Sequence, residues 1–209
     1  MKLKIILLFV FIVTTLNATP TKFIINHDGL LDQRAQTKIN QIGIEVQNKL
    51  QSNLYVYIIE NNGIDMKTAR EERINKIREF DKKILKDLRG SYSVLILSID
   101  QMYANILSSE DLKDKIDKRD ILDGYVIPLL ASKDKNTLFA KTSAATLNGY
   151  AQIADSLAEQ NDIKLESSIG SEGKTASTIW RVFMYSLVLI GIVSYVFIIL
   201  REKKIIKNG

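Results

Sequence analysis

Residues 92–99, with the sequence YSVLILSI, form the stretch that decides the fold of this chain. The run is almost continuously apolar, whereas a strand with one face in water alternates apolar and polar residues. Its length suits a strand better than a helix, and Arg89-Gly90-Ser91 before it and Asp100-Gln101 after it are breaking signals. The sequence therefore predicts a central strand that is covered on both faces.

Three further strand candidates accompany this central stretch. They are rich in β-branched and aromatic residues or alternate apolar with polar positions, and they comprise residues 22–26, 54–60 and 103–107. Apolar residues elsewhere recur at spacings of three and four, which predicts helices from Asp32, from Asp65, from Ser109, over 120–131 with a bend or an end at Pro128, and over 136–160. This alternation predicts an α/β fold, specifically a three-layer α/β/α sandwich around a sheet of about four strands.

The net charge of +5 is unevenly distributed along the chain. Residues 19–178 contain 22 of the 29 Lys and Arg residues and 23 of the 24 Asp and Glu residues, so this region has a net charge of −1. The sequence has no clustered positive segment there, which argues against nucleic-acid binding. The chain also has no cysteine, which excludes disulfides, thiolate metal sites and cysteine nucleophiles.

Residues 1–18 have the order of a secretory signal peptide. Two lysines precede an apolar run over residues 5–13, and small or polar residues follow as far as Ala18. An uncleaved N-terminal anchor is the alternative, because Leu16 is larger than the residue preferred three positions before cleavage. Both interpretations predict export of the region that follows.

The C-terminal part of the chain predicts one membrane crossing. Residues 179–200, IWRVFMYSLVLIGIVSYVFIIL, are long enough for a transmembrane helix across a hydrocarbon core of about 30 Å. The basic tail, residues 201–209, should stay in the cytoplasm. Residues 164–178 are rich in Ser, Gly, Thr and Glu, which is typical of a flexible linker. We therefore expect residues 22–163 to form a periplasmic domain anchored in a bacterial inner membrane.

The order of these elements resembles the TPM domain family over roughly residues 23–160. Ile24-Ile25-Asn26-His27-Asp28-Gly29-Leu30-Leu31 is similar to the strand end and apolar pair with which the family opens, and Ser109-Glu110-Asp111-Leu112 keeps the acid that follows its hairpin. Residues 89–93 lack the Asp and Asn that precede the family's central strand. The family includes plant thylakoid lumen proteins with weak acid phosphatase activity and many bacterial exported, membrane-anchored proteins. The resemblance implies that the domain assists membrane-associated complexes, as some relatives do.

Acidic residues near the predicted strand ends are candidate metal ligands. If the first three strands run parallel, Asp28 and Asp100 meet at one edge of the sheet, and Glu110 and Asp111 follow the hairpin. Hard cations take several oxygen ligands, so a cluster of these four acids predicts a calcium or magnesium site. The alternative is that they are ordinary turn and capping acids. His27, the only histidine, is a candidate general base, although no nucleophile motif accompanies it.

Two classes of function follow from these features. The first is a membrane-anchored extracytoplasmic interaction or accessory domain that binds a membrane or periplasmic protein, with a tether that raises its local concentration. The alternative is a metal-dependent phosphoric-ester hydrolase, in which a divalent cation polarises the phosphate. The missing Asp and Asn favour the first class. Convergence of Asp28, Asp100 and Glu110 in the fold would favour the second.

Overall fold

The computed structural model describes residues 22–168 of the chain. The chain divides into two compact units, residues 1–168 and 169–209, and the described residues belong to the first. Within residues 22–168, no helix combines the length and the apolar character that a membrane crossing requires. The predicted signal peptide, transmembrane helix and basic tail lie outside the described residues, as does the predicted linker from residue 169 onward.

A four-stranded mixed sheet forms the centre of the described domain. Its strands are β1 (Ile24–Asn26), β2 (Asn53–Ile59), β3 (Tyr92–Ser98) and β4 (Tyr103–Ser108), and they lie in the order β1-β2-β3-β4. The first three strands are parallel, and β4 returns antiparallel to β3. The predicted α/β fold with four strands is therefore confirmed.

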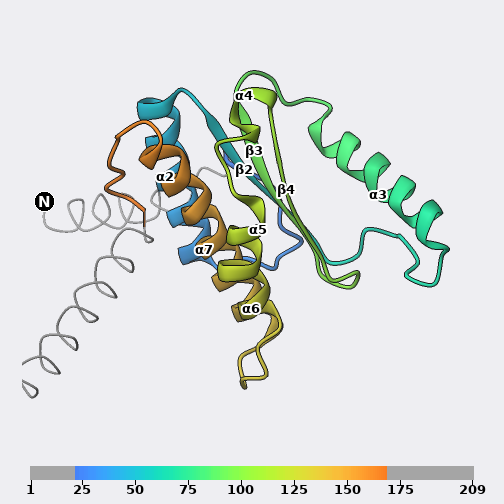
Figure 1. Ribbon diagram of the computed structural model, residues 1–209. Coiled ribbons are helices and arrows are strands. Elements are labelled where there is room, and N and C mark those ends of the chain that lie inside the picture. Colours follow the sequence, from blue (N-terminus) through green and yellow to red (C-terminus); the bar gives the residue numbers. More distant parts are fainter. Residues whose placement is uncertain (1–21, 169–209) are drawn as a thin grey trace, which may run out of the picture. The chain divides into compact units, whose positions relative to one another are not determined.

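Two long helices pack on one face of this sheet (Figure 1). They are α2 (Gln33–Leu50) and α7 (Leu138–Glu159), which contact each other along their lengths. The side chain of Asp32 accepts a hydrogen bond from the Ala35 N–H, which confirms it as the N-cap of α2. Tyr150 on α7 is fully buried, and its hydroxyl donates to the carbonyl of Leu54 in β2 at 2.9 Å. This bond satisfies a hydroxyl that would be costly to bury alone.

A single helix, α3 (Arg70–Leu85), lies on the other face, where Figure 1 shows it projecting away from the strands at its N-terminal end. Ile84 is the one residue of α3 that is buried, and it packs with Val94 and Ile96 of β3. The predicted helix start at Asp65 is wrong. The Asp65 carboxylate accepts from the Lys67 N–H in a turn, and α3 begins five residues later.

The segment between β4 and α7 consists of short helical pieces. They are α4 (Glu110–Lys113), α5 (Lys118–Ile121), the π-helical η1 (Leu122–Val126) and α6 (Ile127–Leu130). Pro128 does not end the predicted helix. A proline lacks an N–H and crowds the carbonyl four residues before it. Here a wider π-helical turn precedes Pro128, in which the Ile127 N–H bonds to the Leu122 carbonyl.

Residues 164–168, which composition assigns to the flexible linker, lie against α2. Leu165 is only 3% exposed. The Glu45 carboxylate accepts from the N–H groups of Glu166 and Ser167, each at 2.8 Å, and from the Ser167 hydroxyl. Lys49 pairs with Glu45 at 2.7 Å and donates to the carbonyl of Lys164 at 3.0 Å. The buried Leu165 side chain and the Glu45 carboxylate thus hold residues 164–168 in place, although their composition is typical of a flexible linker.

Candidate functional site

The C-terminal edge of the parallel strands carries a polar network, as the sequence predicts. Asp28 follows β1 with a positive φ of 43°, and its carboxylate accepts from the Glu60 N–H at 2.9 Å and from the Asn26 side chain at 3.0 Å. The backbone bond from Glu60 is the main cause that holds the pKa of Asp28 below its usual value. His27 lies beside it, and its Nδ1 accepts from the Gly29 N–H at 3.1 Å. These groups hold the β1 turn to the end of β2.

A second set of bonds joins the loop after β2 to the turn between β3 and β4. The Asp100 carboxylate accepts from the Asn61 side chain at 2.8 Å. The Gln101 side chain accepts from the Ser98 hydroxyl at 2.7 Å and from the Asn62 N–H at 3.1 Å, and it donates to Asn61 at 3.0 Å. The polar side chains at this edge therefore bind one another and the backbone.

Glu110 and Asp111 lie at the opposite end of the strands from Asp28 and Asp100. Because β4 is antiparallel to β3, it carries the chain back by the length of β3, about 20 Å. Asp111 accepts from the Ser91 hydroxyl just before β3, and bonds from Ser109 and then Ser91 lower its pKa. Glu110 is 93% exposed and lies 3.8 Å from Lys113.

The fold therefore does not bring the four acids of the predicted metal site together. One ion cannot bind carboxylates at both ends of a strand, because oxygen ligands lie about 2.0–2.6 Å from calcium or magnesium. Within residues 22–168, no group of three or more His, Asp or Glu side chains is placed to hold a metal ion.

Beside the polar network lies an apolar groove of about 480 Å³ that the sequence reasoning did not find. It lies between the β3–β4 hairpin and the segment that leads from α6 into α7, and it is lined by Ser98, Ile99, Met102, Tyr103, Ala104, Ile127, Leu130, Ala131 and Leu138. Met102, in the hairpin turn with a φ of 47°, is 88% exposed. Ile127, Leu138 and the adjacent Phe139 are also exposed. Large apolar side chains exposed together in this way are typical of binding surfaces.

The two residues with a hydroxyl group among those that line the apolar groove, Tyr103 and Ser98, use that hydroxyl within the domain. The Tyr103 hydroxyl donates to the Asp81 carboxylate of α3, with oxygen distances of 2.8 and 3.0 Å. Burial is the main cause of the raised pKa of Tyr103, so it stays protonated at physiological pH. The hydroxyl of Ser98 is bound to Gln101. The groove consequently suits apolar groups better than a ligand that needs hydrogen bonds.

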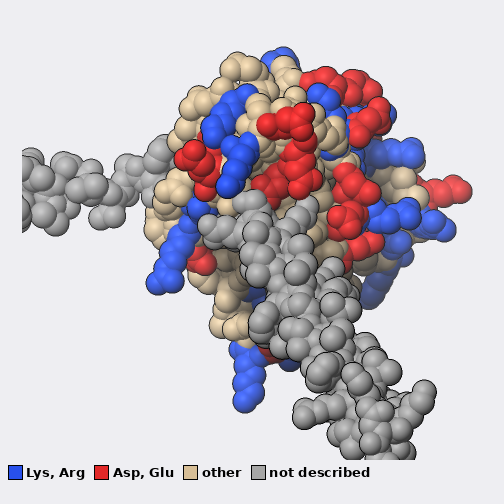
Figure 2. All heavy atoms as spheres, turned by 60° about the vertical axis from the view of Figure 1, so that its left-hand side comes forward, with Lys and Arg blue, Asp and Glu red and all other residues tan. Residues whose placement is uncertain are grey.

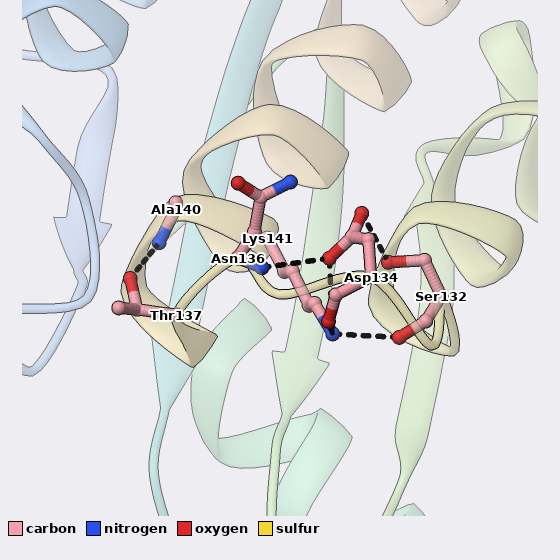
Figure 3. A network of polar contacts seen from close by, with 6 residues as sticks. All are labelled: Ser132, Asp134, Asn136, Thr137, Ala140 and Lys141. Carbon is pink, nitrogen blue, oxygen red and sulfur yellow. Dashed lines mark hydrogen bonds and ion pairs between the residues drawn. The ribbon is translucent and has the colours of Figure 1, made fainter.

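One wall of the apolar groove is fixed by a network around Lys141, shown in Figure 3. This half-buried lysine on α7 donates to the carbonyl of Ser132 at 2.6 Å and pairs with Asp134 at 3.4 Å. The Asp134 carboxylate also accepts from the Asn136 N–H and the Ser132 hydroxyl, each at 3.0 Å. The network holds the loop of residues 131–137 in place beside the groove.

Comparison with known proteins adds no family. No protein-family model matches the chain, and no curated protein matches it significantly.

Proposed function

We propose that this chain is a TPM-like accessory protein whose exported domain binds the apolar segment of a membrane-associated protein. In this proposal a signal peptide, residues 1–18, directs export, and residues 179–200 cross the bacterial inner membrane. The tail, residues 201–209, stays in the cytoplasm, and the described domain works in the periplasm. Binding of this kind suits the assembly, maintenance or repair of membrane complexes.

The observation that carries the proposal is the apolar groove. It is open, it has about 480 Å³ of space, and exposed Met102, Ile127 and Leu138 surround it. A tethered domain needs only modest intrinsic affinity, because the tether raises its concentration near partners in the same membrane. Burying these side chains against a partner supplies about 25 cal/mol for each Å² of apolar surface removed from water.

The hydrolase alternative has less support. It requires Asp28, Asp100 and Glu110 to act on one cation, and Glu110 lies at the far end of the hairpin. The carboxylates of Asp28 and Asp100 stabilise turns through the bonds described above. We therefore propose binding, and not phosphate-ester hydrolysis, as the function of this edge of the sheet.

Site-specific photocrosslinking in cells that produce the full chain tests the proposal. A photoreactive amino acid replaces Met102 or Leu138 at the groove, and as a control it replaces Ile44, which is 45% exposed on α2. We expect the groove positions to crosslink to a discrete membrane protein and the control position not to. Equal crosslinking at all three positions contradicts the proposal, as does a divalent-cation-dependent phosphatase activity of the purified chain that Asp28→Asn abolishes.

A further inference from the structure

The fold does not explain why position 102 holds a methionine. Met102 ends the turn between β3 and β4, where its N–H donates to the carbonyl of Ile99 at 3.0 Å, and its φ of 47° lies in the left-handed region. Glycine or asparagine adopts this conformation at lower cost than a large side chain does. Packing does not offset the cost, because Met102 is 88% exposed. A strained residue with so little contact to the domain points to a role outside the fold.

The sulfur of the described domain is confined to two thioethers. The chain has no cysteine, and Met66 and Met102 are the methionines of residues 22–168. Both line a small hollow of about 70 Å³ between the loop after β2, the first half of α3 and the β3–β4 turn. Met66 is 46% exposed, about half as much as Met102. The two thioethers therefore share one neighbourhood and differ in their access to solvent.

Met102 also lines the apolar groove, so a chemical change at its sulfur changes the groove directly. Figure 2 shows acidic and basic side chains mixed over the face that it presents. The described residues that line the groove, by contrast, carry no charge, and their two hydroxyls are bound to Asp81 and Gln101. One new polar atom at Met102 therefore alters the character of this lining strongly.

Resting on the function proposed above, we propose that Met102 is an oxidation site through which hydrogen peroxide weakens binding in the groove. The Sδ lone pair attacks one oxygen of the peroxide, and the O–O bond breaks. The other oxygen leaves as water after it takes the proton of the first. The sulfur loses two electrons and becomes a sulfoxide, which replaces an apolar thioether with a polar group.

The sulfoxide oxygen accepts hydrogen bonds and is solvated in the free domain, because Met102 is exposed. An apolar ligand that covers it removes this water, and the hydroxyls of Tyr103 and Ser98 donate elsewhere. Leaving a covered acceptor without a donor weakens binding by about tenfold. The fold itself should keep its melting temperature, since the oxygen is covered only in the complex.

Oxidation rates test the site without reference to any ligand. The purified full chain in peroxide-free detergent is treated with hydrogen peroxide, and mass spectrometry of its peptides follows sulfoxide formation at each position. We expect Met102 to react about twofold faster than Met66 or more, because the exposed sulfur meets the oxidant more often. Equal rates, or faster oxidation of Met66, overturn the inference.

Photocrosslinking from position 138 tests the effect on binding. A lysate of cells that produce the full chain, with a photoreactive amino acid in place of Leu138, receives the peroxide dose that converts Met102, then catalase, and is irradiated. We expect the crosslink to the membrane protein to fall several-fold. Met102→Leu has a similar size and no sulfur, so it should keep the crosslink after the same treatment. Met102→Gln places an amide oxygen near the position of the sulfoxide oxygen and should weaken the crosslink without peroxide.

The outcomes separate this inference from the function on which it rests. Fast oxidation of Met102 with an unchanged crosslink overturns the inference and leaves the groove as a docking site. A loss that Met102→Leu does not prevent also overturns it, because another group, on this chain or on the partner, is then responsible. Absence of the crosslink before peroxide is added contradicts the proposed function itself, and the inference falls with it.

Discussion

The two faces of the sheet differ in how completely they are covered. On the face of α2 and α7, side chains from both helices and from the strands form one large buried cluster that includes Ile39, Val46 and Ile153. On the face of α3, the buried cluster has only three residues, Ile84, Val94 and Ile96. Ile74 on α3 and Ile25 on β1 remain exposed.

This difference indicates that the α2–α7 face supplies most of the stability of the domain, because stabilisation by burial is roughly proportional to the apolar area removed from water. The α3 face contributes less and tolerates more change. The apolar groove lies at the edge of the well-packed side and takes one wall from α6 and α7. Dense packing on this side limits how far the adjoining wall of the groove can move, which reduces the ordering cost of binding.

A large loss of stability is expected at Gly43 on α2, which lies against Phe23 and Tyr150. A Cβ at this position would lie 2.4 Å from Phe23 Cδ2 and 2.7 Å from the Tyr150 hydroxyl. Gly43→Ala should therefore lower the free energy of unfolding by about 3 kcal/mol, despite the better helix propensity of alanine. Thermal unfolding of the full chain in detergent, followed by circular dichroism, measures this change.

Gly124→Ala in η1 is the matched control, because a Cβ there has no atom within 4 Å. It should leave stability unchanged or raise it by up to about 1 kcal/mol, since alanine restricts the unfolded chain. Equal losses at the two glycines would show that close helix packing on the α2–α7 face is not the cause.

A pair of isoleucine truncations compares the two faces directly. Ile153 on α7 is 1% exposed within the large cluster, whereas Ile84 on α3 is 9% exposed within the small one. Ile153→Ala should cost about 4 kcal/mol and Ile84→Ala about 2 kcal/mol, because the cavity left on the α3 side is more easily filled by water or by movement of the helix. Urea unfolding of both variants measures the two costs. A larger loss for Ile84→Ala would reverse the comparison.

The strands and the α2 boundary were predictable because their signals are local. The run of residues 92–99 has no polar alternation and becomes the buried centre of the sheet, and Asp32 caps α2. Asp65 misled the prediction because an aspartate that begins a turn and one that caps a helix make the same bond to a nearby N–H. No local pattern distinguishes these two cases.

The site depends on contacts between distant segments, so much less of it was predictable. The strand-end positions of Asp28 and Asp100 follow from parallel strands and were expected, whereas the far position of Glu110 follows from the predicted antiparallel hairpin and was overlooked. The apolar groove combines residues near 100, 130 and 138, which no periodicity connects. Leu165 was the missed signal that the chain after α7 remains packed.

Acidic groups on the two faces of the sheet should change the free energy of unfolding by smaller amounts, and these changes should depend on pH in opposite directions. Burial tends to raise the pKa of Glu45 on α2, but bonds from Lys49, Ser167 and Glu166 outweigh it and lower the pKa to about 2. A carboxylate whose pKa is lower in the folded state than in the unfolded state stabilises the fold at pH values above its unfolded pKa of about 4.5. This contribution to stability is lost as the pH falls toward 2.

Glu45→Gln should therefore reduce the free energy of unfolding by about 2 kcal/mol at neutral pH and by much less near pH 2.5. Melting curves of the variant and the unchanged chain at several pH values give the difference. The same variant should speed hydrogen exchange of the Glu166 and Ser167 amides, which mass spectrometry detects. A stability difference that does not depend on pH would mean that the carboxylate charge is not what holds residues 164–168.

The smallest effect concerns Asp81 on α3, whose pKa shifts in the opposite direction. Burial raises it, and bonds from Tyr103 and Asn105 only partly offset this. A carboxyl group with a raised pKa in the folded state favours the protonated form, so its charge opposes folding at neutral pH and this cost disappears in acid. Asp81→Asn should thus raise stability at pH 7 by less than about 1 kcal/mol and give no gain near pH 3. The same melting series measures both values. A loss of stability at pH 7 would mean that the hydrogen bond from Tyr103 to the charged carboxylate outweighs the cost of burying that charge. The α3 face would then be held more firmly than its sparse packing indicates.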